Sequence, residues 1–183
     1  MALKEYHKID LETGMILDVS LFDDIEDVPE DYKLGWGERQ MFSPIWSFEH
    51  NDWIESKPFS EILQVYRDAK DFELNQACND TILAGFDYEI DGVLYHFSYD
   101  KEAQQNFTDA QTILSDGLVQ ELMWTVQKDG EYTRIPINKA VMDKLKVVIM
   151  MHKTSCISKY RDVLMKIVNE AQTIEEIESV TWA

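Results

Sequence analysis

The chain has 183 residues, enough for one ordinary domain or two small ones, and its 45% hydrophobic content supports a folded core rather than a disordered chain. Its 35 acidic residues outnumber the 17 basic ones, which gives a formal net charge of −18. This charge excludes binding to nucleic-acid phosphates or to an anionic membrane surface as an expected function, because both would repel the protein.

Residues 1–58 predict a small β module. Lys4 to Ile9 and Met15 to Phe22 have the composition of strands, and Gly14 between them can adopt the positive φ of a tight hairpin turn. An acidic run follows, which we expect to be a solvated loop, with a patch for a basic partner or a cation as the alternative. Its spacing lacks the glycine and the terminal glutamate of a helix-loop-helix calcium site. The carboxylates of this acidic patch are Asp23, Asp24, Glu26, Asp27, Glu30 and Asp31.

Residues 35–55 concentrate large aromatic side chains between short extended pieces, with turns marked by Pro44 and by the pair Asn51-Asp52. Each such ring buries on the order of 150–250 Å², so either the module itself or another chain must cover them. We predict that this aromatic segment docks a partner, and a local core or a sugar-binding platform are the alternatives. Its members are Trp36, Phe42, Trp46, Phe48 and Trp53.

A helical pattern begins at residue 59 and predicts an amphipathic connecting helix over residues 59–85, with Ser60 as its N-cap and Gly85 just after its end. The apolar face of this helix comprises Ile62, Tyr66, Ala69 and Phe72. Two hairpins are then expected, residues 87–99 turning at Asp91-Gly92 and residues 121–137 turning at Asp129-Gly130. Between them, Asp100 is expected to cap a helix that ends near Gly117.

Asn138 is expected to begin a long helix that ends near Ala171, and Thr173 and Glu176 have the spacing of a capping box for a last short helix. The core stripe of the long helix is predicted as Val141, Leu145, Val148, His152, Cys156, Tyr160, Val163 and Ile167. The expected fold is α+β, with a small N-terminal β module, a connecting helix, and two β-hairpins packed with the long C-terminal helix over residues 86–183.

The sequence holds no motif for catalysis, because a Walker loop, a dinucleotide fingerprint, a nucleophile elbow and a zinc motif are all missing. His152 is expected to be a core histidine with a hydrogen-bonded ring. Cys78 and Cys156 are expected to be reduced thiols, with a disulfide between them as the alternative. The N-terminus lacks the apolar region of a signal peptide, and the longest wholly apolar run, residues 147–151, is too short to cross a bilayer. We therefore expect a protein that is not an enzyme, with no catalytic residues, no cofactor, no bound metal and no membrane insertion.

Residues 75–182 resemble a domain of unknown function found in tail proteins of tailed bacteriophages and prophages. The resemblance rests on an ordered set of features: Leu74-Asn75-Gln76-Ala77-Cys78, Gly85-Phe86, Tyr95-His96-Phe97-Ser98-Tyr99-Asp100, Glu102-Ala103-Gln104-Gln105-Asn106-Phe107, Trp124, Asp129-Gly130, the helix around His152, Ile174-Glu175-Glu176-Ile177 and Trp182. The first 60 residues are similar to the tryptophan-containing segment of tail-fibre and fibre-assembly proteins. They keep its proline, aromatic residue and turn as Pro44, Trp46 and Asn51-Asp52, followed by Trp53-Ile54-Glu55, but carry an unusually acidic loop ahead of them.

The resemblance implies a structural component of the tail tip, baseplate or tail fibre that acts through protein–protein contacts. Its expected partners are other phage tail or fibre proteins, or further copies of itself. A tail-fibre assembly chaperone and a carbohydrate-binding module for host recognition are the alternatives. The resemblance places the protein in the virion tail, after synthesis in the cytoplasm of the bacterial host, and it carries over no catalytic residues.

Overall fold

The computed structural model of the protein describes residues 3–23 and 27–183. The chain forms two compact units, Met1–Val65 and Tyr66–Ala183, which we call the N-terminal unit and the C-terminal unit. The fold is α+β, as predicted from the sequence. The boundary between the units falls within helix α1 (Phe59–Ala84), so most of the helix expected as a connector is an integral part of the C-terminal unit.

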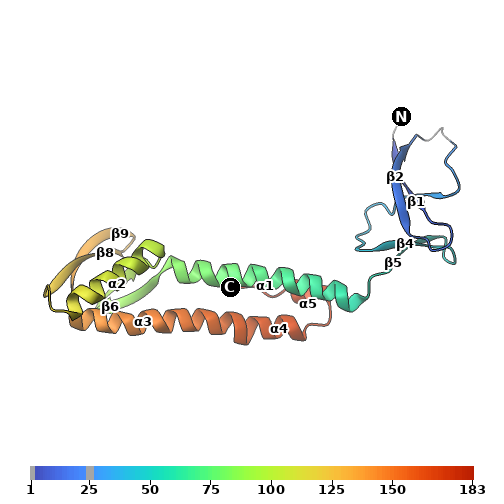
Figure 1. The fold of residues 1–183 in the computed structure, drawn as a ribbon. Coiled ribbons are helices and arrows are strands. Elements are labelled where there is room, and N and C mark those ends of the chain that lie inside the picture. Colours follow the sequence, from blue (N-terminus) through green and yellow to red (C-terminus); the bar gives the residue numbers. More distant parts are fainter. Residues whose placement is uncertain (1–2, 24–26) are drawn as a thin grey trace. The chain divides into compact units, whose positions relative to one another are not determined.

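The N-terminal unit consists of two small antiparallel sheets (Figure 1). The first sheet has the order β2-β1-β3 and comprises β1 (Lys4–Ile9), β2 (Ile16–Phe22) and β3 (Tyr32–Leu34). The second pairs β4 (Pro44–Ser47) with β5 (Asp52–Glu55). The predicted strands are therefore present, whereas β3, which is three residues long, was not predicted because it has too few residues to show an alternation.

The turn between β1 and β2 also joins the two sheets. Gly14 has φ +72°, as the hairpin prediction required, and its carbonyl oxygen accepts a hydrogen bond from the backbone N–H of Trp46 at 3.0 Å. A Cβ atom at Gly14 would lie 2.2 Å from the carbonyl oxygen of Trp46. Glycine is thus required here both by the backbone conformation and by the close approach of the second sheet.

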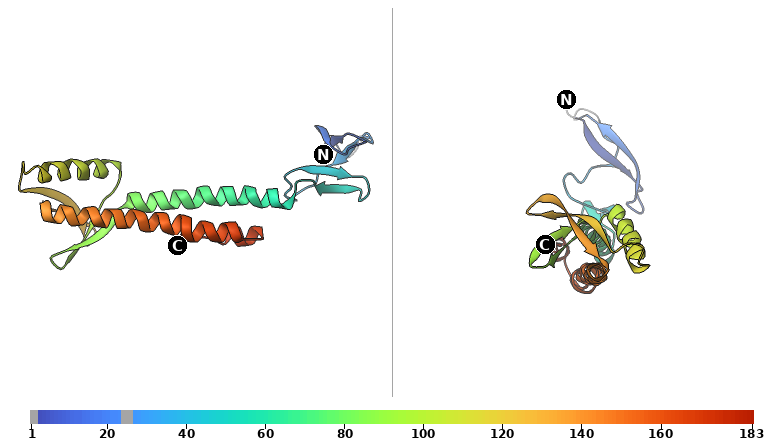
Figure 2. Two further views of the ribbon diagram at one scale, coloured as in Figure 1. Left: turned by 60° about the horizontal axis from the view of Figure 1, so that its bottom comes forward. Right: turned by 90° about the vertical axis from the view of Figure 1, so that its left-hand side faces the viewer.

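In the C-terminal unit, α1 runs beside a long helical rod, with a four-stranded sheet and a further helix at one end of the pair (Figures 1 and 2). The rod comprises α3 (Lys139–Ser158), the π-helical segment η1 (Lys159–Leu164) and α4 (Met165–Glu170), and it is followed by α5 (Ile174–Glu178). The sheet has the order β6-β7-β8-β9, from β6 (Phe86–Ile90), β7 (Val93–Phe97), β8 (Glu121–Lys128) and β9 (Glu131–Asn138). Helix α2 (Lys101–Ser115) connects its two hairpins.

Local chemistry sets the ends of these elements where the sequence predicted them. Both hairpins turn through an Asp-Gly pair in which each residue has positive φ, with values of 51° and 80° at Asp91-Gly92 and 52° and 83° at Asp129-Gly130. Asp100 accepts a hydrogen bond from the N–H of Ala103 at 2.8 Å, and Asn138 caps α3 in the same way. The capping box formed by Thr173 and Glu176 is also present.

The core of the C-terminal unit lies where the sheet meets α2 and α3, and aromatic rings dominate it. The rings of Phe86 and Phe97 stack with a centroid separation of 5.5 Å, and Phe107 of α2 packs against both. The buried members of this core are Phe86, Phe97, Tyr99, Phe107, Ala110, Leu114, Val126, Ile137, Met142 and Leu145. Burial of such side chains contributes about 1.5–3 kcal/mol each, which makes this cluster the main source of stability in the unit.

The predicted buried face of α1 is correct at Ile62 and Tyr66, which are buried and half-buried, and wrong further along the helix. Phe72 is 74% exposed and Ala69 is also exposed, whereas Leu74 and Cys78 are buried. Two apolar stripes with helical spacing coexist on this helix, and the spacing alone does not show which stripe a partner covers. Ser60 is not the N-cap either, because the helix begins at Phe59.

The predicted core stripe of the long helix is correct through Tyr160 and wrong by one residue from Val163 onward. Val163 and Ile167 are 53% and 49% exposed, whereas Leu164 and Val168 are 8% and 0% exposed. A π-helical turn holds one more residue than an α-helical turn, so the residues after it reach the core one position later than an uninterrupted α-helix predicts.

Candidate functional site

The aromatic segment surrounds Trp53, which forms the core of the N-terminal unit. Its side chain is 2% exposed, and the rings of Trp36 and Trp46 each meet it edge to face with centroid separations of 5.4 Å. Its indole N–H donates to the carbonyl oxygen of Leu34 at 2.6 Å. Trp53 is therefore enclosed by its own unit, which corrects the expectation that it presents a docking surface to a partner.

His7, which was not predicted as a site residue, completes this cluster. Its side chain is buried, its ring stacks on Trp36 with a centroid separation of 4.5 Å, and it meets Trp53 edge to face at 5.4 Å. The ring also contacts Glu5, with 2.9 Å between Nε2 and the carboxylate oxygen. The signal for this role was the alternation in β1, which puts His7 on the same face as the buried Ile9.

The other rings of the aromatic segment lie at the periphery of the cluster. Trp36, Phe42 and Trp46 are half-buried, and Phe48 exposes 50% of its surface. Lysine ammonium groups cover two of these rings, with Lys33 Nζ 5.3 Å from the ring centroid of Trp46 and Lys57 5.8 Å from that of Phe42. The segment is thus mainly a local core with a partly exposed rim.

Two charged contacts hold the loop before β4 against β5. Both terminal nitrogens of Arg39 donate to the Asp52 carboxylate at 2.8 Å, and this guanidinium holds the pKa of Asp52 below its usual value. The Glu55 carboxylate accepts hydrogen bonds from the backbone N–H groups of Phe42 and Ser43. These contacts fix the loop that follows Trp36.

The acidic patch is only partly within the described residues, because Asp24 and Glu26 lie outside them. Asp27 and Glu30 are exposed, Asp23 is half-buried, and Asp31 lies 3.6 Å from Lys8 Nζ. In residues 3–23 and 27–183, no group of three or more His, Cys, Asp or Glu side chains is arranged to hold a metal ion.

An apolar row on the edge strand β2 is the clearest surface feature of the N-terminal unit. Leu17, Val19 and Leu21 are 60%, 49% and 59% exposed, and they lie on one face because strand side chains alternate. Val19 pairs with His7 on β1, so the row shares its face with the tryptophan cluster. The alternation of apolar residues in β2 is visible in the sequence. Whether the aromatic rings of the unit cover these residues depends on the packing of those rings, which the sequence does not show.

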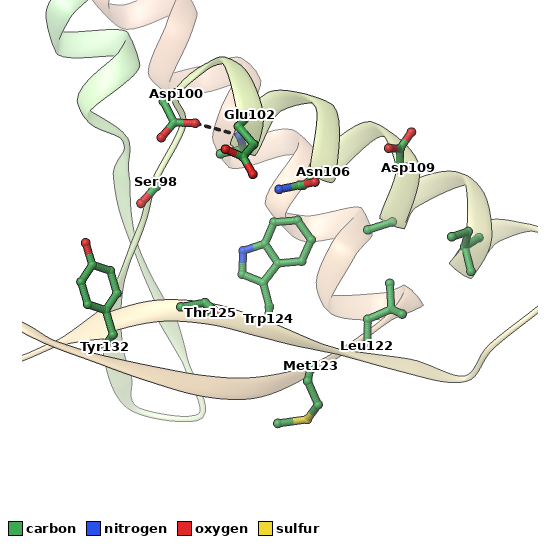
Figure 3. A pocket seen from close by; sticks show the side chains of 13 residues that line it. Ser98, Asp100, Glu102, Asn106, Asp109, Leu122, Met123, Trp124, Thr125 and Tyr132 are labelled. Atoms are coloured by element: carbon green, nitrogen blue, oxygen red, sulfur yellow. Dashed lines mark hydrogen bonds between the residues drawn. The ribbon is translucent and has the colours of Figure 1, made fainter.

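A cavity of about 440 Å³ lies between α2 and β8 in the C-terminal unit (Figure 3). The indole of Trp124 stands near its middle and packs against Phe107, with 4.5 Å between ring centroids. Figure 3 shows Asn106 of α2 above the indole, with Glu102 of the same helix beside it. The lining residues are Ser98, Asp100, Glu102, Ala103, Asn106, Asp109, Ala110, Ile113, Leu122, Met123, Trp124, Thr125 and Tyr132.

The histidines and thiols of the C-terminal unit are not arranged as activated groups. His96 is held through both ring nitrogens, by Asp87 at 2.8 Å and by the carbonyl oxygen of Ala84 at 3.0 Å. His152 packs near Phe86, but its Nε2 atom is buried without a hydrogen-bond partner among the described residues, contrary to expectation. Burial raises the pKa of the thiols of Cys78 and Cys156, which keeps both protonated near neutral pH.

A family model described as a domain of unknown function (DUF4376) matches residues 65–181, which span almost the whole C-terminal unit. No curated protein and no solved structure matches the chain. Among the described residues, no helix combines the length and the apolar character needed to cross a membrane.

Proposed function

The chain belongs to the family described as a domain of unknown function (DUF4376), and from that premise we propose that it is a non-enzymatic bacteriophage tail component that acts through protein–protein contacts. The observation that carries this proposal is the exposed apolar row of Leu17, Val19 and Leu21 on β2. The biological setting comes from the resemblance of both parts of the chain to tail and tail-fibre proteins.

Strand β2 has the properties of a docking edge. It pairs with β1 on one side only, so within the described residues its outer edge has no neighbouring strand. An extended segment of another protein can pair with such an edge and place alternate apolar side chains over the row. Because the three side chains are about half exposed, covering them would contribute about 1–2 kcal/mol each, before the cost of ordering the partner.

The charge of the N-terminal unit favours a basic partner surface. The first 60 residues hold 14 acidic and 5 basic residues, and the side chains of Asp27 and Glu30 are exposed. Complementary charge around an apolar contact raises the association rate and selects against acidic partners. We therefore propose that the partner is another tail or fibre protein with an extended apolar segment flanked by Lys or Arg.

The test is a double substitution, Leu17→Glu with Leu21→Glu, introduced into a phage that encodes the protein. Mass spectrometry of purified particles should find the native protein in a fixed ratio to other tail proteins and should find little of the folded double variant. The matched control is Phe72→Glu, which changes a residue of similar exposure in the C-terminal unit and should leave incorporation unchanged. Normal incorporation of the double variant would rule out β2 as the docking edge.

The same experiment separates a tail component from an assembly chaperone. If the native protein is absent from purified particles and fibre assembly fails when its gene is deleted, the protein is an assembly chaperone and not a tail component. Presence in a fixed ratio supports the component.

The cavity around Trp124 favours a carbohydrate-binding module as the second candidate. Its volume of about 440 Å³ is within the usual range for small-ligand sites. In the part of the chain that the structure describes, the indole N–H of Trp124 and the side-chain amide of Asn106 have no hydrogen-bond partner, and Glu102 adds an acceptor. An aromatic face combined with amide and carboxylate groups can bind the C–H face and the hydroxyl groups of a sugar. A glycan array with the native protein and with Trp124→Ala tests this candidate, and it fails if the native protein binds no glycan.

A further inference from the structure

A second cavity, of about 640 Å³, lies in the C-terminal unit where α1, α2, α3 and η1 meet. It is a separate pocket from the one around Trp124, although α2 contributes residues to both. Its lining residues are Asn75, Cys78, Asn79, Ile82, Leu83, Lys101, Gln104, Lys153, Ile157, Tyr160 and Arg161.

The charge of this cavity is opposite to that of the protein. Lys101, Lys153 and Arg161 line it, and no aspartate or glutamate is among its lining residues. In a chain with 35 acidic and 17 basic residues, three cations around one cavity whose lining includes no carboxylate form a local reversal of charge. Some cations elsewhere form ion pairs, as in the 2.7 Å contact of Lys70 with Glu73. Across the described residues, none of the three cavity cations forms an ion pair with a carboxylate.

We propose that this cavity binds a small organic phosphate, with the phosphate group held by Lys101, Lys153 and Arg161. Arginine donates a fork of N–H groups that matches phosphate oxygens, and lysine supplies a compact positive charge. Asn75 and Asn79 of α1 also line the cavity, and their side-chain amides can donate further hydrogen bonds. Three charges in one cavity make an anion the ligand class that complements it.

The remaining wall of the cavity is apolar and accounts for the organic part of the ligand. Ile82, Leu83 and Ile157 line it, and the volume of about 640 Å³ exceeds what one phosphate ion needs. An ion alone would leave these side chains in contact with water, whereas an attached apolar or planar group would cover them. The ligand is therefore a phosphate ester with an apolar portion.

The π-helical segment η1 positions Arg161 at this cavity. Single π-helical turns within α-helices occur frequently at functional sites, because the extra residue changes the direction of the side chains that follow. Tyr160, the preceding residue, donates its hydroxyl to the Asp71 carboxylate on α1. That hydrogen bond occupies the Asp71 carboxylate and holds η1, which carries Arg161, against α1.

The experiment is a titration of the full chain with adenosine monophosphate and, separately, with inorganic phosphate, followed by calorimetry and by amide NMR shifts. We expect AMP to bind the native protein, with shifts concentrated in residues 75–83, 101–104 and 153–161. Arg161→Gln and Lys153→Gln should each weaken binding about tenfold, the usual cost of losing one charge-assisted hydrogen bond. Because the cations are partly exposed, affinity should also fall as salt is raised.

Lys166→Gln is the matched control, because Lys166 lies on the same helical rod, 4.0 Å from Glu170, and does not line the cavity. It should bind AMP as the native protein does. Failure of AMP and phosphate to bind the native protein, or equal weakening by all three substitutions, would overturn the phosphate site. If the protein binds AMP no more tightly than inorganic phosphate, the proposal that the ligand has an organic portion is overturned. None of these outcomes depends on the proposed docking of β2 in a phage tail.

Discussion

The hydroxyl group of Tyr160 in η1 donates a hydrogen bond to the Asp71 carboxylate in α1, which joins two residues that are 89 positions apart in the chain. The contact lies at the π-helical turn, after which Leu164 replaces Val163 in the core. It also raises the pKa of Tyr160 to about 12, chiefly because the neutral phenol is held by the carboxylate. The hydrogen bond that holds the rod against α1 can therefore be followed through the titration of the Tyr160 hydroxyl group.

Tyr160→Phe is predicted to lower the free energy of unfolding by about 1–2 kcal/mol at neutral pH, because it removes one hydrogen bond to a charged group. The folded pKa of about 12 lies above the value of about 10 for an unfolded tyrosine. The contribution is therefore fully present below about pH 10 and is lost as the pH rises through about 12. Urea denaturation of both proteins over this pH range should show their difference shrinking.

Tyr132→Phe is the control for this prediction, because Tyr132 is 72% exposed and should tolerate the change at every pH. A difference between Tyr160→Phe and the native protein that stayed constant with pH would contradict the proposed linkage.

Deletion of Val163 is predicted to be tolerated, because it removes the extra residue of η1 and lets an uninterrupted α-helix place Leu164 and Val168 in the core. Deletion of Val147, which is also exposed, should be far more damaging, because it rotates the residues that follow by roughly 100° and moves Cys156 off the buried face. Thermal unfolding followed by circular dichroism compares the two. Equal loss of stability would show that the π-helical turn is not a simple one-residue insertion.

Features set by neighbouring residues could be predicted from the sequence, whereas features set by distant packing could not. The turn at Asp91-Gly92 and the cap at Asp100 depend on local backbone chemistry, and both were predicted correctly. The exposed position of Phe72 depends on which stripe of α1 the rod covers, and η1 has no local signal of its own. The cavity around Trp124 combines residues of α2 and β8 that only the folded chain brings together.

The candidate docking site illustrates the same limit. The sequence indicated that large rings near Trp53 must be covered, but it did not show whether their own unit or another chain covers them. The structure encloses Trp53 and leaves Leu17 and Leu21 exposed on the neighbouring strand. The burial of His7 among the tryptophans could be anticipated only from its alternation with Ile9.

Trp53→Ala is predicted to destabilise the N-terminal unit by about 3–5 kcal/mol, because it leaves a cavity among Trp36, Trp46 and His7. Amide NMR spectra should lose the dispersed signals of residues 3–23 and 27–58 and retain those of the C-terminal unit. Phe48→Ala, at a residue with 50% exposure, should cost less than about 1 kcal/mol. Comparable losses in the two variants would contradict the assignment of Trp53 as the core residue.

Gly14→Ala and Gly130→Ala compare two glycines that share a positive φ but differ in their surroundings. An alanine at either position pays about 1–2 kcal/mol for the left-handed conformation, with φ at 72° and 83°. At Gly130 the new methyl group meets no atom within 4 Å, so no further cost is expected. At Gly14 it would lie 2.2 Å from the carbonyl oxygen of Trp46, and relief of that overlap separates the hairpin from the second sheet.

Overpacking of this kind adds about 1–3 kcal/mol to the cost of Gly14→Ala. Gly14→Ala should therefore unfold the N-terminal unit at a clearly lower urea concentration than in the native protein. Gly130→Ala should change the unfolding of the C-terminal unit only slightly. Equal small effects would mean that the β1–β2 turn and β4 are not held together as the hydrogen bond from Trp46 to Gly14 requires.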